Sequence, residues 1–299
     1  ALEALPPGSK VLVSLDYDPG SMPELQPMAE SFFRYCFMRD LKIIIIGLWP
    51  NGPIQANSAL EVILNEPDIK KKNPKYGIDY VNLGYTAGNE VVIERMGSDI
   101  PVTFPKDYSG NKTEDLPLMK GVKNFNNIDF VYNLSAGYPG TVEWVLFGVD
   151  PYKIKLGAGN TAVQAPQIYP YLNSGQLVGL LGGMKGGAEF EIATGHPAKA
   201  VKFMFSQSVS HALICFFILI GNFAYFAFQG QAGFYNFINR ASIDNRQRPR
   251  LAGANRADIN IGMPFIRIVF ASAKHLGFRF QLRMYFQTNH RFVFHIFLK

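Results

Sequence analysis

Five short, continuous apolar segments constrain the fold of this chain more than any other feature. They span residues 10–18, 41–49, 78–86, 128–137 and 152–160 and are rich in β-branched side chains. Uninterrupted apolar runs of this length are typical of strands covered on both faces, as in a parallel sheet. The segments between them are long enough for crossover helices. The sequence therefore predicts an α/β fold with a doubly wound, mostly parallel, five-stranded sheet of the Rossmann-like kind.

Helical patterns lie between and after these segments. Residues 21–40 repeat apolar side chains at helical spacing, namely Leu25, Met28, Phe32 and Cys36. This pattern predicts a helix packed on the sheet, and residues 55–66 predict a second helix. Residues 167–191 also resemble a helix, although each glycine between 179 and 187 costs up to ~1 kcal/mol relative to alanine in a helix interior. We expect close packing or a local break to explain these glycines.

The segment 210–228 contains no Asp, Glu, Lys or Arg. At about 1.5 Å per residue it is nearly as long as the ~30 Å hydrocarbon core of a bilayer is thick. A transmembrane helix is the favoured interpretation, because apolar residues lie all round it and aromatic residues gather at one end. The alternative is a buried helix of a large soluble domain. We expect an α/β domain over 1–200, a transmembrane region over 201–230 and a basic tail rich in Arg and Phe over 231–299.

Charge divides the chain at the same place. The net charge is +6, but residues 231–299 hold eleven Lys and Arg against two Asp, and residues 1–230 hold eighteen basic against twenty-one acidic side chains. The first 230 residues therefore give no reason to expect nucleic acid as a partner. Since the positive charge follows the apolar helix, the positive-inside rule predicts a cytoplasmic tail and an α/β domain on the opposite side of the membrane.

The two ends of the chain raise separate expectations. Residues 278–286 and 291–297 alternate apolar and polar side chains as strands do, but no second core is evident. The tail is expected to be poorly ordered or to lie on a membrane surface where arginines meet anionic lipid. Its composition also fits a segment that is not the natural end of the protein. Because the chain begins at Ala1 without a methionine, we expect a signal or anchor segment upstream.

Two aspartates at the end of the first apolar segment are the most prominent candidates for chemistry. Asp16 and Asp18 would lie where open α/β sheets bind ligands, and carboxylates are preferred ligands of hard cations. Their D-x-D spacing resembles the first motif of haloacid-dehalogenase-type phosphatases. That family normally has Thr or Val where this chain has Gly20, and it has acidic residues after a later strand, where residues 156–163 have none. We therefore favour a structural role in which one aspartate caps the next turn or helix.

Further polar and small residues fall at the ends of the predicted strands. Together with the aspartates, the ligand-binding candidates are Asp16, Asp18, Trp49, Gly84, Ser135 and Asn160. Ser135 lacks the flanking glycines of a nucleophile elbow, and Asn160 follows a glycine-rich turn without the third glycine of a dinucleotide fingerprint. We assign no catalytic residue, and the sequence leaves any metal or cofactor open.

Three stretches carry a resemblance to a family. The strings at residues 4–30, 116–137 and 159–191 resemble uncharacterised bacterial membrane-associated proteins, in which a similar α/β region lies between hydrophobic segments. The resemblance covers roughly residues 1–230 and implies a Rossmann-like α/β domain with one or more flanking transmembrane segments. It implies no activity.

These observations favour a membrane-anchored α/β module for binding, sensing or assembly, without catalytic activity. Its expected partners are the lipid bilayer and other membrane proteins, and its expected location is a membrane crossed once or more. The alternative is a metal- or nucleotide-dependent enzyme, phosphatase-like, that uses Asp16 and Asp18 at the carboxyl edge of the sheet. A third hypothesis is a soluble nucleotide-binding enzyme with residues 210–228 buried.

Overall fold

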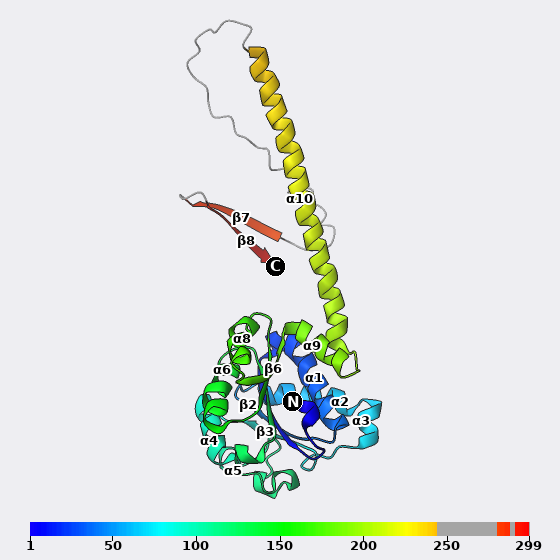
Figure 1. The fold of residues 1–299 in the computed structure, drawn as a ribbon, viewed down its shortest axis with the longest axis vertical. Helices are drawn as coiled ribbons and strands as arrows, with labels where there is room; N and C mark the ends of the chain where they lie inside the picture. Colours follow the sequence, from blue (N-terminus) through cyan, green and yellow to red (C-terminus); the bar gives the residue numbers. More distant parts are fainter. Residues whose placement is uncertain (244–279, 288–290, 299) are drawn as a thin grey trace. The chain divides into compact units, whose positions relative to one another are not determined.

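The computed structural model describes residues 1–243, 280–287 and 291–298 and divides into two compact units, Ala1–Tyr225 and Phe226–Lys299. The first unit contains a sheet (Figure 1). Its strands are β1 Lys10–Asp16, β2 Lys42–Gly47, β3 Tyr80–Tyr85, β4 Phe130–Ser135, β5 Leu156–Asn160 and β6 Leu177–Gly182. They pair in parallel in the order β3-β2-β1-β4-β5-β6. The order reverses between β1 and β4, which is where doubly wound sheets form a crevice.

The predicted α/β fold with a parallel sheet is confirmed, but the sheet has six strands where the sequence predicted five. The sixth strand, β6, falls within residues 167–191, which we expected to be one helix. That expectation is wrong, because α8 (Ala165–Asn173) precedes the strand and α9 (Gly183–Ala193) follows it. Gly175 has a φ of 79° and Gly183 a φ of 59°. Glycine adopts these left-handed backbone conformations readily, so the chain can change direction after α8 and again after β6.

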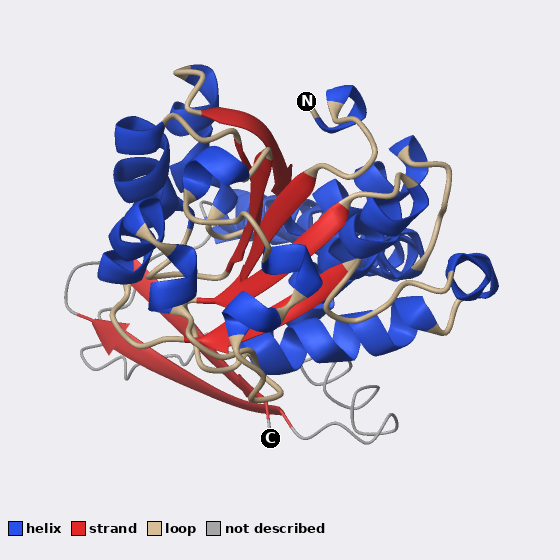
Figure 2. Ribbon diagram, turned by 90° about the horizontal axis from the view of Figure 1, so that it is seen from below, coloured by secondary structure: helices blue, strands red, loops and turns tan. Residues whose placement is uncertain are grey.

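Helices cover both faces of the sheet (Figure 2). One face carries α1 (Met22–Met38), α2 (Gly52–Leu64), α3 (Pro67–Lys72) and α9, and the other carries α4 (Glu90–Ser98), α5 (Ile100–Thr103), α6 (Thr141–Trp144) and α8. The shorter helices are η1 Leu2–Ala4, η2 Pro19–Ser21, η3 Thr113–Asp115, η4 Pro117–Met119, η5 Phe125–Asn127, the π-helical η6 Val145–Val149 and α7 Asp150–Tyr152. The two helices predicted before β3 are therefore present. The second begins three residues earlier than expected, since Pro53 suits a first helical turn.

Alternate residues of each strand enter two separate cores. Along β1, Val11, Val13 and Leu15 face the core under α1 and α2, whereas Leu12 faces the core under α4, α6 and α8. Fully burying one such side chain contributes about 1.5–3 kcal/mol relative to leaving it exposed. The continuous apolar runs in the sequence follow from this arrangement, because both faces of every central strand are covered.

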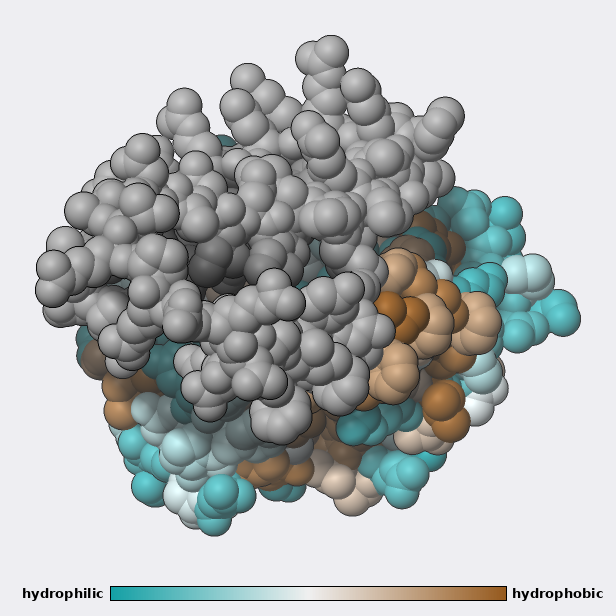
Figure 3. All heavy atoms as spheres, turned by 90° about the horizontal axis from the view of Figure 1, so that it is seen from above, coloured by the Kyte–Doolittle hydropathy of each residue, from teal (hydrophilic) through white to brown (hydrophobic). Residues whose placement is uncertain are grey.

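Helix α10 (Lys199–Ile243) begins in the first unit. Its part Lys199–Phe226 is long and apolar enough to cross a membrane, with a mean hydropathy of 1.9, and its most apolar window is not buried in the described structure. Phe223 is 78% exposed and Phe205 is 74% exposed. Hydrophobic side chains are also gathered at the surface in the view from above (Figure 3). The helix is therefore not packed as a core helix of a soluble domain would be.

The second unit contains two described strands. β7 (Phe280–Gln287) and β8 (Arg291–Leu298) pair in an antiparallel two-stranded sheet. The strand-like alternation in the sequence is therefore confirmed. The expectation of a poorly ordered or membrane-surface tail falls mainly on residues 244–279 and 288–290, which lie outside the described residues. The division of the chain at residues 200 and 230 stays a prediction.

Candidate functional site

Asp16 ends β1 and is completely buried. Its Oδ1 accepts hydrogen bonds from the Leu48 N–H at 2.6 Å and from Ser14 Oγ at 3.0 Å, and its Oδ2 accepts from Asn133 Nδ2 at 2.6 Å. Burial raises the pKa of Asp16 to about 7, while these donors and the Trp144 indole act to lower it. The carboxyl group thus joins β1, β4 and the segment after β2, and does not project into the crevice.

A chain of hydrogen bonds leads from this carboxyl group toward the surface. Asn133, which donates to Asp16, accepts a hydrogen bond from Thr141 Oγ1 at 2.7 Å. Thr141 accepts from Asn160 Nδ2 at 2.9 Å, and the same amide group donates to Gln164 Oε1 at 2.9 Å. These residues come from β4, α6 and β5 and from the residue just before α8. The network therefore fixes the carboxyl ends of β1, β4 and β5 relative to one another.

The loop between β4 and α6 forms the outer end of this network. The Gly137 carbonyl accepts hydrogen bonds from Ser135 Oγ at 3.0 Å and from Gln164 Nε2 at 3.3 Å. Trp49 Nε1 donates to the Pro139 carbonyl at 2.8 Å. The loop is thus hydrogen-bonded to the end of β4, to the residue before α8 and to the segment after β2.

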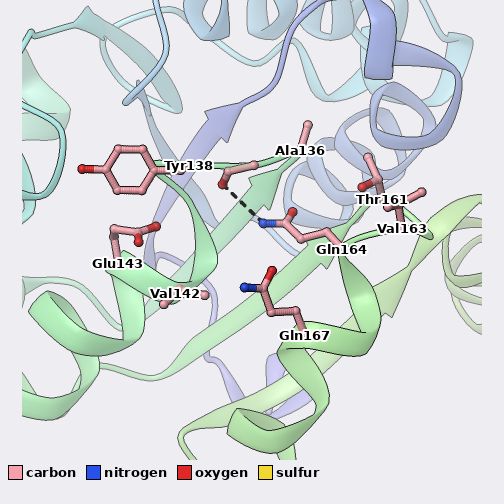
Figure 4. A pocket seen from close by; sticks show the side chains of 9 residues that line it. Ala136, Tyr138, Val142, Glu143, Thr161, Val163, Gln164 and Gln167 are labelled. Carbon is pink, nitrogen blue, oxygen red and sulfur yellow. Dashed lines mark hydrogen bonds between the residues drawn. The ribbon is translucent and has the colours of Figure 1, made fainter.

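A pocket of about 420 Å³ opens beside this loop (Figure 4). Its lining residues are Ala136, Gly137, Tyr138, Val142, Glu143, Thr161, Val163, Gln164 and Gln167. The dashed line in Figure 4 marks the hydrogen bond that Gln164 donates to the Gly137 carbonyl, and the amide of Gln167 is directed into the open space. Polar side chains on apolar walls are the usual composition of a small-molecule site.

Glu143 contributes the charge among these lining residues. Its Oε2 accepts a hydrogen bond from the Gly140 N–H at 2.7 Å, at the start of α6. The Tyr138 ring is 61% exposed at the rim, and its hydroxyl donates to Glu90 Oε2 at 2.8 Å. Carboxylates therefore lie on this side of the pocket, and none of the described lining residues carries a positive charge to balance them.

The structure brings four of the six predicted site residues into one region. Ser135 and Asn160 belong to the hydrogen-bond network, Trp49 holds the loop beside the pocket, and Asp16 forms the inner end of the network. None of these four residues lines the pocket itself. They hold the lining residues Gly137 and Gln164 and the neighbouring loop in place through hydrogen bonds.

The other two predicted residues lie apart from this pocket. Asp18 Oδ1 accepts a hydrogen bond from the Ser21 N–H at 3.2 Å and caps η2, the role that we favoured for one of the aspartates. Gly84 lies in β3, two strands from β1, with a φ of 86° and Tyr108 as its neighbour. Neither residue contributes to the pocket lining.

Sequence reasoning missed most of the residues that form the pocket and its support. They are Asn133, Tyr138, Thr141, Glu143, Gln164 and Gln167. Asn133 gave a usable signal, because a buried amide in the middle of an apolar strand needs a hydrogen-bond partner. The others gave none, since they come together only through the pairing of β4 with β5.

A second polar cluster joins the α/β domain to α10. Glu191 of α9 is 1% exposed, and its carboxylate accepts hydrogen bonds from the N–H groups of Ala198 at 2.7 Å, Ala200 at 2.9 Å and Val201 at 3.0 Å. These are N–H groups at the start of a helix, which have no partner within the helix. The carboxylate therefore caps α10 from within the α/β domain.

Helix α1 links the pocket to this cap. Near its first turn, Glu24 Oε2 accepts a hydrogen bond from the Ala162 N–H at 2.7 Å, between two residues of the pocket lining. Further along, Glu30 Oε1 accepts from Lys199 Nζ at 2.8 Å, at the first residue of α10. Ser31 Oγ lies 3.5 Å from Glu191 Oε1. One helix therefore contacts both the pocket rim and the start of the apolar helix.

Comparison with known proteins identifies no relative: no family model matches the chain, and no curated protein or solved structure matches it significantly. The resemblance to bacterial membrane-associated proteins gains no support from these comparisons and stays a prediction.

Proposed function

We propose that this chain is a membrane-anchored, Rossmann-like α/β module that binds a small molecule at the carboxyl edge of its sheet and acts in sensing or assembly, not in catalysis. Its partners in this proposal are the lipid bilayer, crossed by α10, and other proteins of the same membrane. The predicted resemblance to bacterial membrane-associated proteins agrees with this assignment.

The observation that carries the proposal is the cap on α10. A flexible tether would leave the apolar helix free of the domain, but Glu191 accepts three hydrogen bonds from its start. The carboxylate is buried, and a buried charge is retained only where it is well paired or hydrogen-bonded. In this proposal, a conformational change in the domain moves the start of α10 directly, because no flexible linker separates the two.

The position of the pocket supports a role in binding. It lies at the carboxyl ends of β4 and β5, the edge at which open α/β sheets bind ligands. Its wall is connected to α10 through the contacts of α1 at Glu24 and Glu30. A ligand that shifts the loop after β5 would therefore act on the residues that hold the apolar helix.

The enzyme alternative receives less support from the geometry. Asp16 is enclosed, and each of its oxygens already accepts hydrogen bonds, while Asp18 is used as a cap. Among the described residues there is no group of three or more His, Cys, Asp or Glu side chains placed to hold a metal ion. The pocket lining contains two side-chain amides, two hydroxyl groups and one carboxylate, which suit recognition by hydrogen bonding.

Two measurements on the full chain test the proposal. In membranes washed with alkaline carbonate, the chain is expected to stay in the membrane fraction and to leave it only in detergent. In detergent, a screen of small molecules by thermal shift is expected to yield ligands whose effect disappears in Gln167→Trp, which fills the pocket from the exposed face of α8. Release by carbonate, or ligands that bind the variant equally well, would contradict the proposal.

A further inference from the structure

The sign of the charge around the pocket limits what the pocket can bind. Glu143 lies in its lining, and Glu90 lies next to it through the Tyr138 hydroxyl. Among the described residues that line the pocket there is no Lys, Arg or His. An anionic ligand would bring its charge close to Glu143 without a compensating cation, which is unfavourable at any dielectric constant between that of water and that of the protein interior.

The helix that begins beside the pocket does not reverse this sign. The first N–H groups of a helix usually favour an anion, and many phosphate sites use them. Here the Gly140 N–H donates to Glu143 Oε2 at 2.7 Å, so the protein's own carboxylate occupies that position. The second oxygen of Glu143 makes no hydrogen bond in the described structure and stays available to a donor.

The remaining groups suit an organic cation. The Tyr138 ring is exposed at the rim, and Figure 4 shows it close to Glu143, so a cation held by the carboxylate also lies near an aromatic ring. On the opposite side, the Gln167 amide points into the pocket and offers both a donor and an acceptor. Val142 and Val163 provide apolar surface for a short carbon chain.

We infer that the pocket between β4, α6 and α8 binds a small organic amine, with its ammonium group at Glu143 and Tyr138 and its polar end at Gln167. This inference rests on the proposed binding function and adds the chemical class of the ligand. The volume of about 420 Å³ accommodates a molecule of this kind.

The test compares three probes of equal length that differ in charge: 1,6-diaminohexane, 1,6-hexanediol and adipate. Calorimetric titration uses the full chain in discs of zwitterionic lipid, so that anionic lipid does not bind the amine. The diamine is expected to bind at least tenfold more tightly than the diol, and adipate is expected not to bind. Raising the salt concentration is expected to weaken diamine binding, because a partly exposed ion pair is screened.

Glu143→Gln is the central variant. Glutamine keeps the side-chain oxygen that accepts from Gly140, so the start of α6 keeps its cap while the charge is removed. Diamine affinity is expected to fall about tenfold or more and diol affinity to stay unchanged. The matched control is Glu189→Gln, which removes the same charge from an exposed position of α9 and is expected to leave both affinities unchanged.

The outcomes separate this inference from the function on which it rests. If the diol or adipate binds as tightly as the diamine, or if Glu143→Gln binds the diamine as tightly as the parent chain, the amine assignment is overturned. Absence of diamine binding at millimolar concentration overturns it as well. The binding function itself fails only if, in addition, no small molecule of any class binds in a way that Gln167→Trp abolishes.

Discussion

At the scale of single residues, the enclosed carboxyl group of Asp16 has the largest consequence for behaviour in solution. Burial raises its pKa to about 7 from the usual 3.8, despite donors from Leu48, Ser14 and Asn133. Below pH 4 the group is protonated in the folded and the unfolded chain alike. Between about pH 4 and 7 the folded chain holds a proton that the unfolded chain has lost, so the free energy of unfolding decreases as the pH rises. Above pH 7 both states are ionised.

We predict that this pH dependence disappears in Asp16→Asn. In the parent chain, the contribution of Asp16 to the free energy of unfolding is expected to change by about 4 kcal/mol over this pH range, at 1.36 kcal/mol per pKa unit. The variant is also expected to be less stable at low pH, because its amide group points an N–H at one of the existing donors. Urea unfolding of the full chain between pH 4 and 8 measures both effects. Asp115→Asn, at an exposed position, is the control, and an unchanged pH slope in Asp16→Asn would contradict the prediction.

A second residue-scale prediction concerns the close approach of α2 to β1. A Cβ atom on Gly52 would overlap the carbonyl oxygen of Leu15, which is backbone and has no room to move. Gly52→Ala is therefore expected to lower the free energy of unfolding by about 1–3 kcal/mol. Gly179→Ala in β6 is the matched control, because a Cβ there meets open space, and it is expected to be neutral or slightly stabilising. Equal effects of the two substitutions in chemical unfolding would refute this account.

At the scale of elements, the fold was predictable where both faces of a strand are buried. β1, β2 and β4 are buried at almost every position and mostly apolar, so each showed in the sequence as an apolar run. β6 is an edge strand of Leu, Val and Gly, partly exposed along most of its length, and its composition fits a helix as well as a strand. The pocket was less predictable than the sheet, because Glu143 and Gln167 acquire their roles only after β4 and β5 have paired.

The element that we expect to be most sensitive to one substitution is the start of α10. In Glu191→Gln an amide NH2 group replaces one of the two carboxylate oxygens and faces backbone donors, so either the hydrogen bond at Ala200 or those at Ala198 and Val201 are lost. A loss of about 1–3 kcal/mol is expected for buried groups left unpaired. Hydrogen exchange of residues 198–201 is expected to accelerate in this variant.

Glu189→Gln is the control for this prediction. Glu189 lies on the same helix but is exposed, and its contact with Lys185 at 3.5 Å is a surface ion pair of little stabilising value. It is expected to leave hydrogen exchange at 198–201 unchanged. If exchange there is equally fast in the parent chain and in Glu191→Gln, the carboxylate does not hold the helix.

At the scale of the whole molecule, the distribution of charge predicts a direction of insertion. The apolar part of α10, Lys199–Phe226, separates a net acidic region from a tail with nine more positive than negative charges. The positive-inside rule counts Lys and Arg close to the ends of a spanning segment. Two lysines lie at the start of this part, at 199 and 202, and four arginines follow it between 240 and 250. The tail is therefore expected on the cytoplasmic side.

Introduced cysteines test this direction. Cys36 is buried in the α1 core, where burial raises the pKa of its thiol, and Cys215 lies within the apolar stretch, so neither is expected to react with a water-soluble maleimide in membranes. In spheroplasts, Lys112→Cys on the α/β domain should be labelled directly, and Ser272→Cys in the tail only after permeabilisation. The reverse pattern would place the domain in the cytoplasm. Labelling of both cysteines without permeabilisation would mean that α10 does not cross the membrane, and the proposed coupling from pocket to bilayer would then have no physical route.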